Sequence, residues 1–200
     1  MTQVQRTAAI GRKRPKVAAV TREDRRRWDE RYVSQERPPI GAVAPPGVFA
    51  AYAEIFPTTG RALDLACGQG LGAVWLARRG LEVLGLDISP IAIGRAWDLA
   101  QRSGVGDRCR FDVFDFDDGL PAGPPVDVIQ CHKFRDRRLD QAIIERLAPG
   151  GLLAIAALSE VDAAPGPFRA APGELPAAFA ELDLVAAGEG QGYAWLLARA

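Results

Sequence analysis

Short apolar runs alternate with segments of helical periodicity from about residue 62 to residue 158 of the chain. The apolar runs are four to eight residues long and rich in Val, Leu and Ile, which is typical of strands buried on both faces. The segments between them carry apolar residues at helical spacing and end at glycine. The pattern predicts strands at 62–66, 82–86, 108–113, 126–131 and 152–158, and helices at 71–79, 90–102 and 139–147.

The two ends of the chain have a different rhythm. Residues 21–32 and 45–55 each fit a helix, the second with proline at its start. A short helix is predicted at 174–181, and two apolar runs, 182–187 and 193–198, flank a glycine-rich link. These runs predict an antiparallel hairpin at one edge of the sheet. The expected fold is therefore α/β, a doubly wound, mostly parallel, Rossmann-like seven-stranded sheet with a C-terminal antiparallel hairpin.

Composition narrows the class of protein. Twenty-five basic and 25 acidic residues give a formal net charge of zero, and no apolar run reaches the length of about 18 residues that a membrane helix needs. We therefore expect no membrane partner. Nine of the Arg and Lys residues fall in residues 1–27. We expect a disordered basic tail over 1–20, with an arm for acidic partners as the alternative, and a single folded domain over 21–200. Three cysteines without a CxxC pair favour a reducing, cytoplasmic location.

Acidic and glycine residues gather where the predicted strands end. Asp64 lies at the end of the first strand, Gly68 and Gly70 follow it, and Asp87 ends the second strand. In an open parallel sheet, ligands bind outside the carboxyl ends of the strands. A carboxylate at the position of Asp87 can accept hydrogen bonds from both hydroxyls of a ribose. These residues predict a nucleoside pocket.

The glycine spacing alone does not choose between two nucleoside ligands. Gly68-x-Gly70-x-x-Ala73 also matches a dinucleotide fingerprint. However, a pyrophosphate at this turn would be repelled by Asp64. A ligand that carries an ammonium group and a sulfonium centre would be attracted instead, which favours S-adenosylmethionine.

Five segments resemble those of the class I S-adenosylmethionine-dependent methyltransferases: 64–70 as the first motif, 86–89 as the second, 112–116 after the third strand, 147–153 before the fifth, and 28–32 in the N-terminal helix. Ala66 replaces the usual first glycine, and this chain is similar in that respect to the tellurite-resistance-type branch. The resemblance implies S-adenosylmethionine as the cofactor. It implies that the cofactor contacts Asp64, Ala66, Gly68, Gly70, Asp87, Ile88, Phe114, Asp115, Phe116 and Gln130.

The acceptor side is expected after the fourth strand, after the fifth strand, and in the N-terminal helices of 21–57, which would form part of the acceptor pocket. His132 is the single histidine and is the candidate general base near neutral pH. Cys131 and His132 are adjacent, which is poor geometry for chelation, so no metal is expected. The other candidates are Trp28, Tyr32, Lys133, Phe134, Arg135, Phe168 and Arg169. For each of them, core packing or a solvated turn is the alternative.

The expected function is methyl transfer from S-adenosylmethionine to a small-molecule acceptor by in-line displacement. Enzymes of this fold that methylate base amino groups carry an (Asp/Asn)-Pro-Pro-aromatic segment after the fourth strand. Residues 130–134 read Gln-Cys-His-Lys-Phe instead, which disfavours base methylation. We therefore do not expect a nucleic-acid acceptor, with methylation of a ribose or of another RNA group left open as the alternative. A catalytically silent cofactor-binding protein that acts in sensing or assembly is the first alternative, and a nicotinamide-dependent oxidoreductase is the second.

Overall fold

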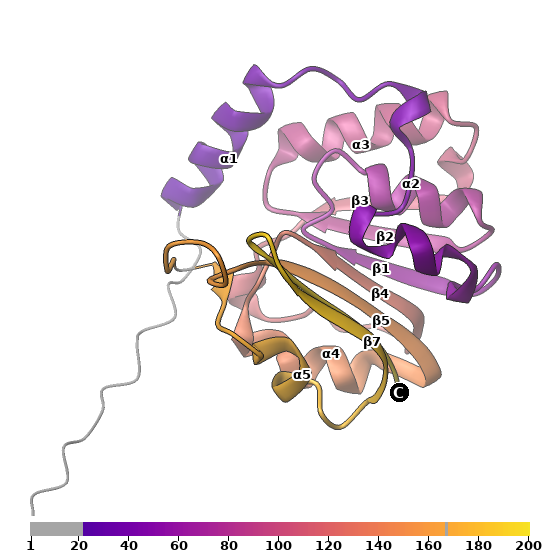
Figure 1. Cartoon of the computed structure of the whole chain (residues 1–200). Helices are drawn as coiled ribbons and strands as arrows, with labels where there is room; N and C mark the ends of the chain where they lie inside the picture. The colour runs from indigo at the N-terminus through magenta and orange to yellow at the C-terminus, as the bar shows by residue number, and fades with distance from the viewer. Residues whose placement is uncertain (1–21, 167) are drawn as a thin grey trace, which may run out of the picture.

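The computed structural model describes residues 22–166 and 168–200, and the predicted tail over 1–20 lies outside them. One twisted sheet organises these residues (Figure 1). Its strands follow the order β3-β2-β1-β4-β5-β8-β7, and the short β6 pairs with β5. The strands are β1 (Arg61–Leu65), β2 (Glu82–Asp87), β3 (Cys109–Val113), β4 (Val126–His132), β5 (Leu147–Ser159), β6 (Arg169–Ala170), β7 (Asp183–Gly190) and β8 (Tyr193–Arg199).

The direction of the strands confirms the predicted fold. Strands β1 to β5 run parallel, whereas β8 is antiparallel to β5 and β7 is antiparallel to β8. Strand order reverses between β1 and β4, and a ligand is expected at the carboxyl ends of these two strands.

Helices cover both faces of the sheet. On one face lie α2 (Leu71–Arg78), α3 (Pro90–Arg102) and the 3₁₀ segment η2 (Gly47–Ile55). On the other face lie α4 (Asp140–Arg146) and α5 (Glu174–Ala178). The N-terminal helix α1 (Arg22–Ser34) contacts α3 beyond the carboxyl ends of the strands (Figure 1).

Alternation along each central strand builds the two layers of core. On β5, Leu152 packs with the α2/α3 layer, while Leu153 and Ile155 pack with the α4/α5 layer. All three side chains are buried, and burial of each contributes roughly 1.5–3 kcal/mol relative to exposure. Because both faces of the central strands are covered, most of their residues are apolar and buried, whereas the edge strand β3 alternates between buried and more exposed residues.

Several predicted elements differ from the structure in their bounds or in the type of helix. The predicted helix 45–55 is a 3₁₀ helix, Gly47–Ile55, in which the buried ring of Phe49 packs against Phe56 and Trp195, with ring centroids 6.3 Å apart in each pair. Helix α5 ends at Ala178 and not at 181. Strand β5 begins at Leu147 and not at 152, because the Pro149–Gly151 turn is carried within it as an irregularity.

The last residue is hydrogen-bonded to that turn. The Gly150 N–H donates to the carbonyl of Ala200 (2.7 Å), and the Ala200 N–H donates to the carbonyl of Gly151 (3.0 Å). Since Leu152 pairs with Arg199, this end of β8 lies at the amino edge of the parallel strands.

Candidate active site

The loop after β1 leaves the sheet through three residues of left-handed backbone. Their φ angles are 51° at Ala66, 54° at Gly68 and 82° at Gly70. A Cβ at Gly70 would lie 2.7 Å from the Cβ of Ala96, so only glycine lets α2 begin this close to α3. Ala66 adopts the same region with a side chain, at a cost of about 1–2 kcal/mol. The result is a loop of bare backbone at the carboxyl end of β1.

Asp87 joins the end of β2 to this loop. Its two carboxylate oxygens accept hydrogen bonds from the N–H of Gly68 and the N–H of Ser89, both at 2.9 Å. The side chain is 5% exposed, and burial raises its pKa despite these two bonds. Each carboxylate oxygen has two lone pairs, so both keep the capacity to accept from a ligand. Asp87 therefore stands where the sequence predicted a ribose acid.

Asp64 lies beneath the first turn of α2. It accepts hydrogen bonds from the backbone N–H of Ala73 and from Nε2 of Gln130 (3.2 Å). Burial raises its pKa to about 7, so the carboxylate is only partly ionised near neutral pH. The other amide atom of Gln130, Oε1, is buried without a hydrogen-bond partner among the described residues. Asp64 and Gln130 thus form one buried polar pair under the glycine loop.

Helix α1 covers the glycine loop. The hydroxyl of Tyr32 lies 2.9 Å from the position that a Cβ of Gly68 would take, and Asp29 accepts a hydrogen bond from the Ser89 hydroxyl. Burial and the nearby charge of Asp87 raise the pKa of Tyr32. The ring of Trp28 stacks on Tyr32 at a centroid distance of 6.0 Å. Sequence reasoning assigned Tyr32 to the acceptor wall, and in the structure its hydroxyl lies against the glycine loop.

The residues after β3 have divided roles. One oxygen of Asp115 accepts from the N–H of Asp117 (3.0 Å) and begins the 3₁₀ turn η4 (Phe116–Asp118). The ring of Phe116 is 5% exposed and packs between Phe114 and Phe134, at centroid distances of 5.5 and 5.2 Å. Phe116 is therefore a core residue, contrary to its expected place beside the adenine. Phe114 remains half-buried, as does Ile88 after Asp87.

His132 ends β4 and is half-buried. Burial, together with the positive charge of Lys133, lowers its pKa to about 4. The imidazole is therefore neutral at physiological pH and is a weak proton acceptor. This pKa lies well below the range that we expected for a general base acting near neutral pH.

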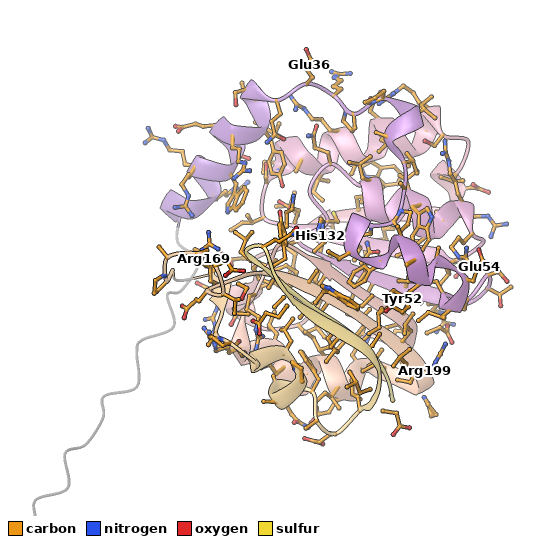
Figure 2. The ribbon with its side chains drawn as sticks, viewed as in Figure 1. Glu36, Tyr52, Glu54, His132, Arg169 and Arg199 are labelled. Atoms are coloured by element: carbon orange, nitrogen blue, oxygen red, sulfur yellow. The ribbon has the colours of Figure 1, made fainter. Side chains whose placement is uncertain are left out.

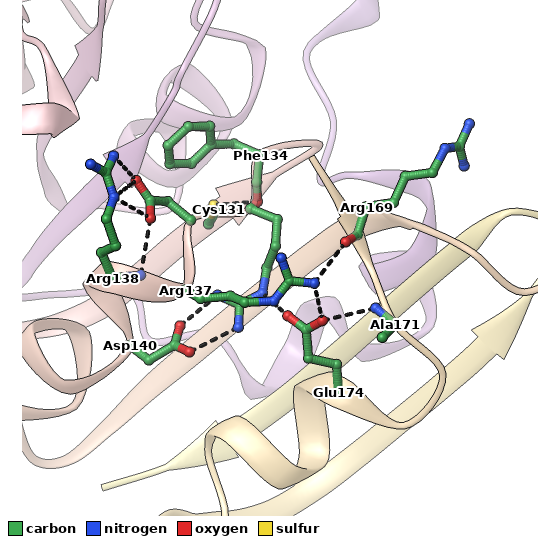
Figure 3. Close-up of polar contacts among 10 residues, drawn as sticks. Cys131, Phe134, Arg137, Arg138, Asp140, Arg169, Ala171 and Glu174 are labelled. Atoms are coloured by element: carbon green, nitrogen blue, oxygen red, sulfur yellow. Dashed lines mark hydrogen bonds and ion pairs between the residues drawn. The ribbon is translucent and has the colours of Figure 1, made fainter. Parts of the chain in front are cut away.

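Arg135 is held in a buried ion network, and its partners Asp140 and Glu174 are labelled in Figure 3. Its guanidinium donates to both oxygens of Asp140, at 2.5 and 2.8 Å, and to Glu174 at 2.7 Å. The side chain is 1% exposed, so it does not face an acceptor. Sequence reasoning missed this network because its members come from the loop after β4 and from α5, 39 residues apart. No local pattern indicates such a pairing.

The remaining acceptor candidates lie at or near the carboxyl edge of the sheet. Lys133 is exposed, with a φ of 64°, and its Nζ lies 5.8 Å from the ring centroid of Tyr193. Arg169 donates from Nη1 to the carbonyl of Ser159 (2.7 Å), and Figure 2 shows His132 and Arg169 on the side of the sheet that faces α1. Phe168 is half-buried.

The described residues contain neither a metal-binding cluster nor a membrane-spanning helix. No group of three or more His, Cys, Asp or Glu residues in 22–166 and 168–200 could hold a metal ion. No helix in the same ranges is long and apolar enough to cross a membrane.

Comparison with known families identifies the segment that carries the site. Residues 62–151 match the family model described as "Methyltransferase domain". A curated relative, the ribosomal RNA small subunit methyltransferase C of Alcanivorax borkumensis, is 33% identical over 113 residues, which are 51% of this chain and 33% of that protein. Others are named ribosomal protein L11 methyltransferase and tRNA 5-carboxymethoxyuridine methyltransferase. The match spans about a third to two fifths of the length of these relatives.

Solved structures share the fold over most of the chain. TehB from Haemophilus influenzae aligns with a TM-score of 0.67 at 21% identity, covering 77% of this chain and 62% of that one. The CcbJ methyltransferase from Streptomyces caelestis aligns with a TM-score of 0.66 at 17% identity, covering 86% and 95%. At these identities the likeness concerns the fold alone. The sequence match over residues 62–151, which include the glycine loop and Asp87, supports a class I S-adenosylmethionine-dependent methyltransferase domain in this chain.

Proposed function

We propose that the protein transfers a methyl group from S-adenosylmethionine to a small-molecule acceptor. The observation that carries the proposal is the hydrogen bond from the Gly68 N–H to the Asp87 carboxylate (2.9 Å). It holds the carboxylate proposed to bind the ribose next to the backbone of the glycine loop. Asp64 is a second buried acid beside the loop. Its negative charge would attract a cationic ligand and repel a pyrophosphate.

The residues of the chain would bind and align the two reactants. Asp87 would accept from the ribose hydroxyls, Gly68 and Gly70 would lie under the methionine moiety, and Asp64 would favour its ammonium group. Phe114, Ile88 and Asp115 would border the adenine. The cofactor supplies an activated methyl group on a sulfonium that leaves as a neutral thioether. Alignment of donor and acceptor can lower such a barrier by roughly 7–11 kcal/mol.

A small-molecule acceptor is supported by the cover that α1 forms over the site. Tyr32 and Asp29 contact the loop and the start of α3, which narrows access to the carboxyl ends of β1 and β2. The segment Gln130–Phe134 also lacks the Pro-Pro-aromatic pattern of base methylation. RNA is the second candidate, favoured by the names of the ribosomal and transfer RNA methyltransferases among the curated relatives.

The test uses S-adenosylmethionine labelled in its methyl group. The full chain is incubated separately with deproteinised small-molecule extract, with total RNA and with protein, and the label is followed into each fraction. We expect label in the small-molecule fraction only. Label in RNA or protein would transfer the proposal to that class of acceptor.

Two other outcomes concern the cofactor. Saturable calorimetric binding of S-adenosylmethionine without transfer to any fraction would favour the silent cofactor-binding protein. Binding of a nicotinamide dinucleotide, with none of S-adenosylmethionine, would overturn the proposal altogether.

A further inference from the structure

The cations beside the acceptor side fall into two groups. Three arginines after β4 are neutralised: Arg135 by Asp140 and Glu174, Arg137 by Glu174, and Arg138 by Asp117 and Asp136. Lys133 and Arg169 differ from them. Among the described side chains of residues 25–166 and 168–200, no carboxylate lies within 4.0 Å of the charged group of Lys133 or of Arg169.

Lys133 and Arg169 both lie near the carboxyl ends of the parallel strands, Lys133 directly after β4 and Arg169 beside the end of β5. The backbone of Lys133 adopts a φ of 64°, a conformation that costs about 1–2 kcal/mol for a residue with a side chain. The Lys133 N–H donates to the Ala156 carbonyl (2.7 Å), which holds that backbone directly after β4. Figure 3 shows the Arg169 guanidinium directed away from the ion network, to which Arg169 contributes only its carbonyl.

The side chains that directly precede Lys133 offer little capacity for proton removal. The single histidine of the chain, His132, is a weak base, and burial raises the pKa of the neighbouring Cys131 thiol to about 12. Phenols, alcohols, thiols and protonated amines must each lose a proton around the time that they accept a methyl group. A carboxylate is already ionised at neutral pH and needs no base.

We propose that the methyl acceptor is a carboxylate, bound through Lys133 and Arg169 and converted to its methyl ester. A carboxylate oxygen attacks the methyl carbon, an O–C bond forms and the S–C bond breaks. The bonding electron pair stays on sulfur, which becomes a neutral thioether, and no proton is transferred. This inference rests on the proposed methyltransferase function and narrows its acceptor.

The first experiment reads the chemistry of the product. The full chain is given methyl-labelled S-adenosylmethionine and matched pairs of acceptors, each a carboxylic acid and its primary amide, such as phenylacetate with phenylacetamide and phenoxyacetate with phenoxyacetamide. Methyl esters release labelled methanol in mild alkali, whereas N-, S- and ether O-methyl groups do not. We expect volatile, alkali-released label from the acids and none from the amides. Label that resists alkali, or transfer to no acid of the panel while the cofactor binds, would overturn the carboxylate assignment.

The second experiment locates the carboxylate by binding. Lys133→Gln and Arg169→Gln should each weaken calorimetric binding of the acid that reacts by about 10- to 100-fold, the loss of one charge-assisted hydrogen bond. Arg78→Gln, at the exposed end of α2, also removes one positive charge and is the control. It should leave the affinity for the acid unchanged. Cofactor affinity should stay within about twofold in all three variants.

The outcomes separate the two proposals. If Lys133→Gln weakens cofactor binding instead, then Lys133 serves the carboxylate of the cofactor, and the acceptor assignment fails while the methyltransferase function stands. Unchanged acid binding in both variants would also overturn it. Absence of cofactor binding by the unmodified chain would remove the proposed function itself.

Discussion

The backbone N–H of Gly68 donates to the carboxylate of Asp87 at 2.9 Å, so the first glycine turn and the end of the second strand form one unit. A substitution at either residue would therefore alter the position of the other. The pair is the part of the site where a nucleoside would gain most of its specificity.

We expect Asp87→Ala to weaken S-adenosylmethionine binding by about 10- to 100-fold, because one or two charge-assisted hydrogen bonds are lost. Calorimetry on the folded variant measures this. Asp118→Ala, in the exposed part of η4, is the control and should bind as the unmodified chain does. An unchanged dissociation constant in Asp87→Ala would remove this residue from the site.

Asp64→Asn should stabilise the fold at pH 8 by about 4 kcal/mol, because the folded-state pKa of about 7 lies above the unfolded value of 3.8. The unpartnered Oε1 of Gln130 can accept from the new amide, while the amide oxygen accepts from Ala73. The unfolded chain ionises first as pH rises from about 4 to 7, so the native chain loses stability in that window. Urea denaturation at pH 4.5 and 8 should show the advantage of the variant shrinking at the lower pH. An advantage that is independent of pH would contradict the raised pKa.

His132→Gln should have the opposite pH signature. The folded-state pKa of about 4 lies below the unfolded value of 6.5, so the unfolded chain binds the proton first as pH falls. The native chain therefore loses stability between about pH 6.5 and 4, and the variant escapes this loss, by about 2 kcal/mol at the lower end. Denaturation curves of both proteins across this range measure the difference. Parallel stability profiles would show that the imidazole titrates normally.

Ala66→Gly should raise the unfolding free energy by about 1 kcal/mol, since it removes a side chain from left-handed backbone at a φ of 51°. Ala142→Gly, within α4, makes the same chemical change in helical backbone and should destabilise by about 1 kcal/mol. Both are read from urea midpoints. Equal losses in the two variants would mean that Ala66 carries no strain.

Glu174→Gln should destabilise the fold by about 2–4 kcal/mol, because Arg135 would lose one carboxylate at a buried site. The exposed Glu181→Gln is the control and should change stability by less than about 0.5 kcal/mol. Thermal or urea unfolding of both variants and of the unmodified chain measures these differences in stability. A small effect of Glu174→Gln would show that Asp140 alone compensates Arg135.

The parallel sheet could be predicted because the central strands carry mostly buried apolar residues and alternate with the predicted helices, whereas the edge strand β3 alternates between buried and more exposed residues. The glycine loop and Asp87 could be predicted because they follow strand ends, where topology alone brings residues together. The ion network of Arg135 could not be predicted, because nothing in the sequence around Arg135 indicates that its partner, Glu174, lies on α5. Nor does the sequence distinguish Phe116, which fills the core, from Phe114, which is less buried, since that depends on how the link between β3 and β4 closes. The low pKa of His132 likewise depends on burial that the sequence does not reveal.

The two hydrogen bonds between Ala200 and the turn at Gly150 and Gly151 have a practical use. They anchor the last residue at the edge of the sheet remote from Asp87 and Lys133. A biotin or affinity handle joined beyond Ala200 would fix the molecule to a sensor surface with the carboxyl ends of the parallel strands turned outward. Cofactor and candidate acids could then be screened on immobilised protein.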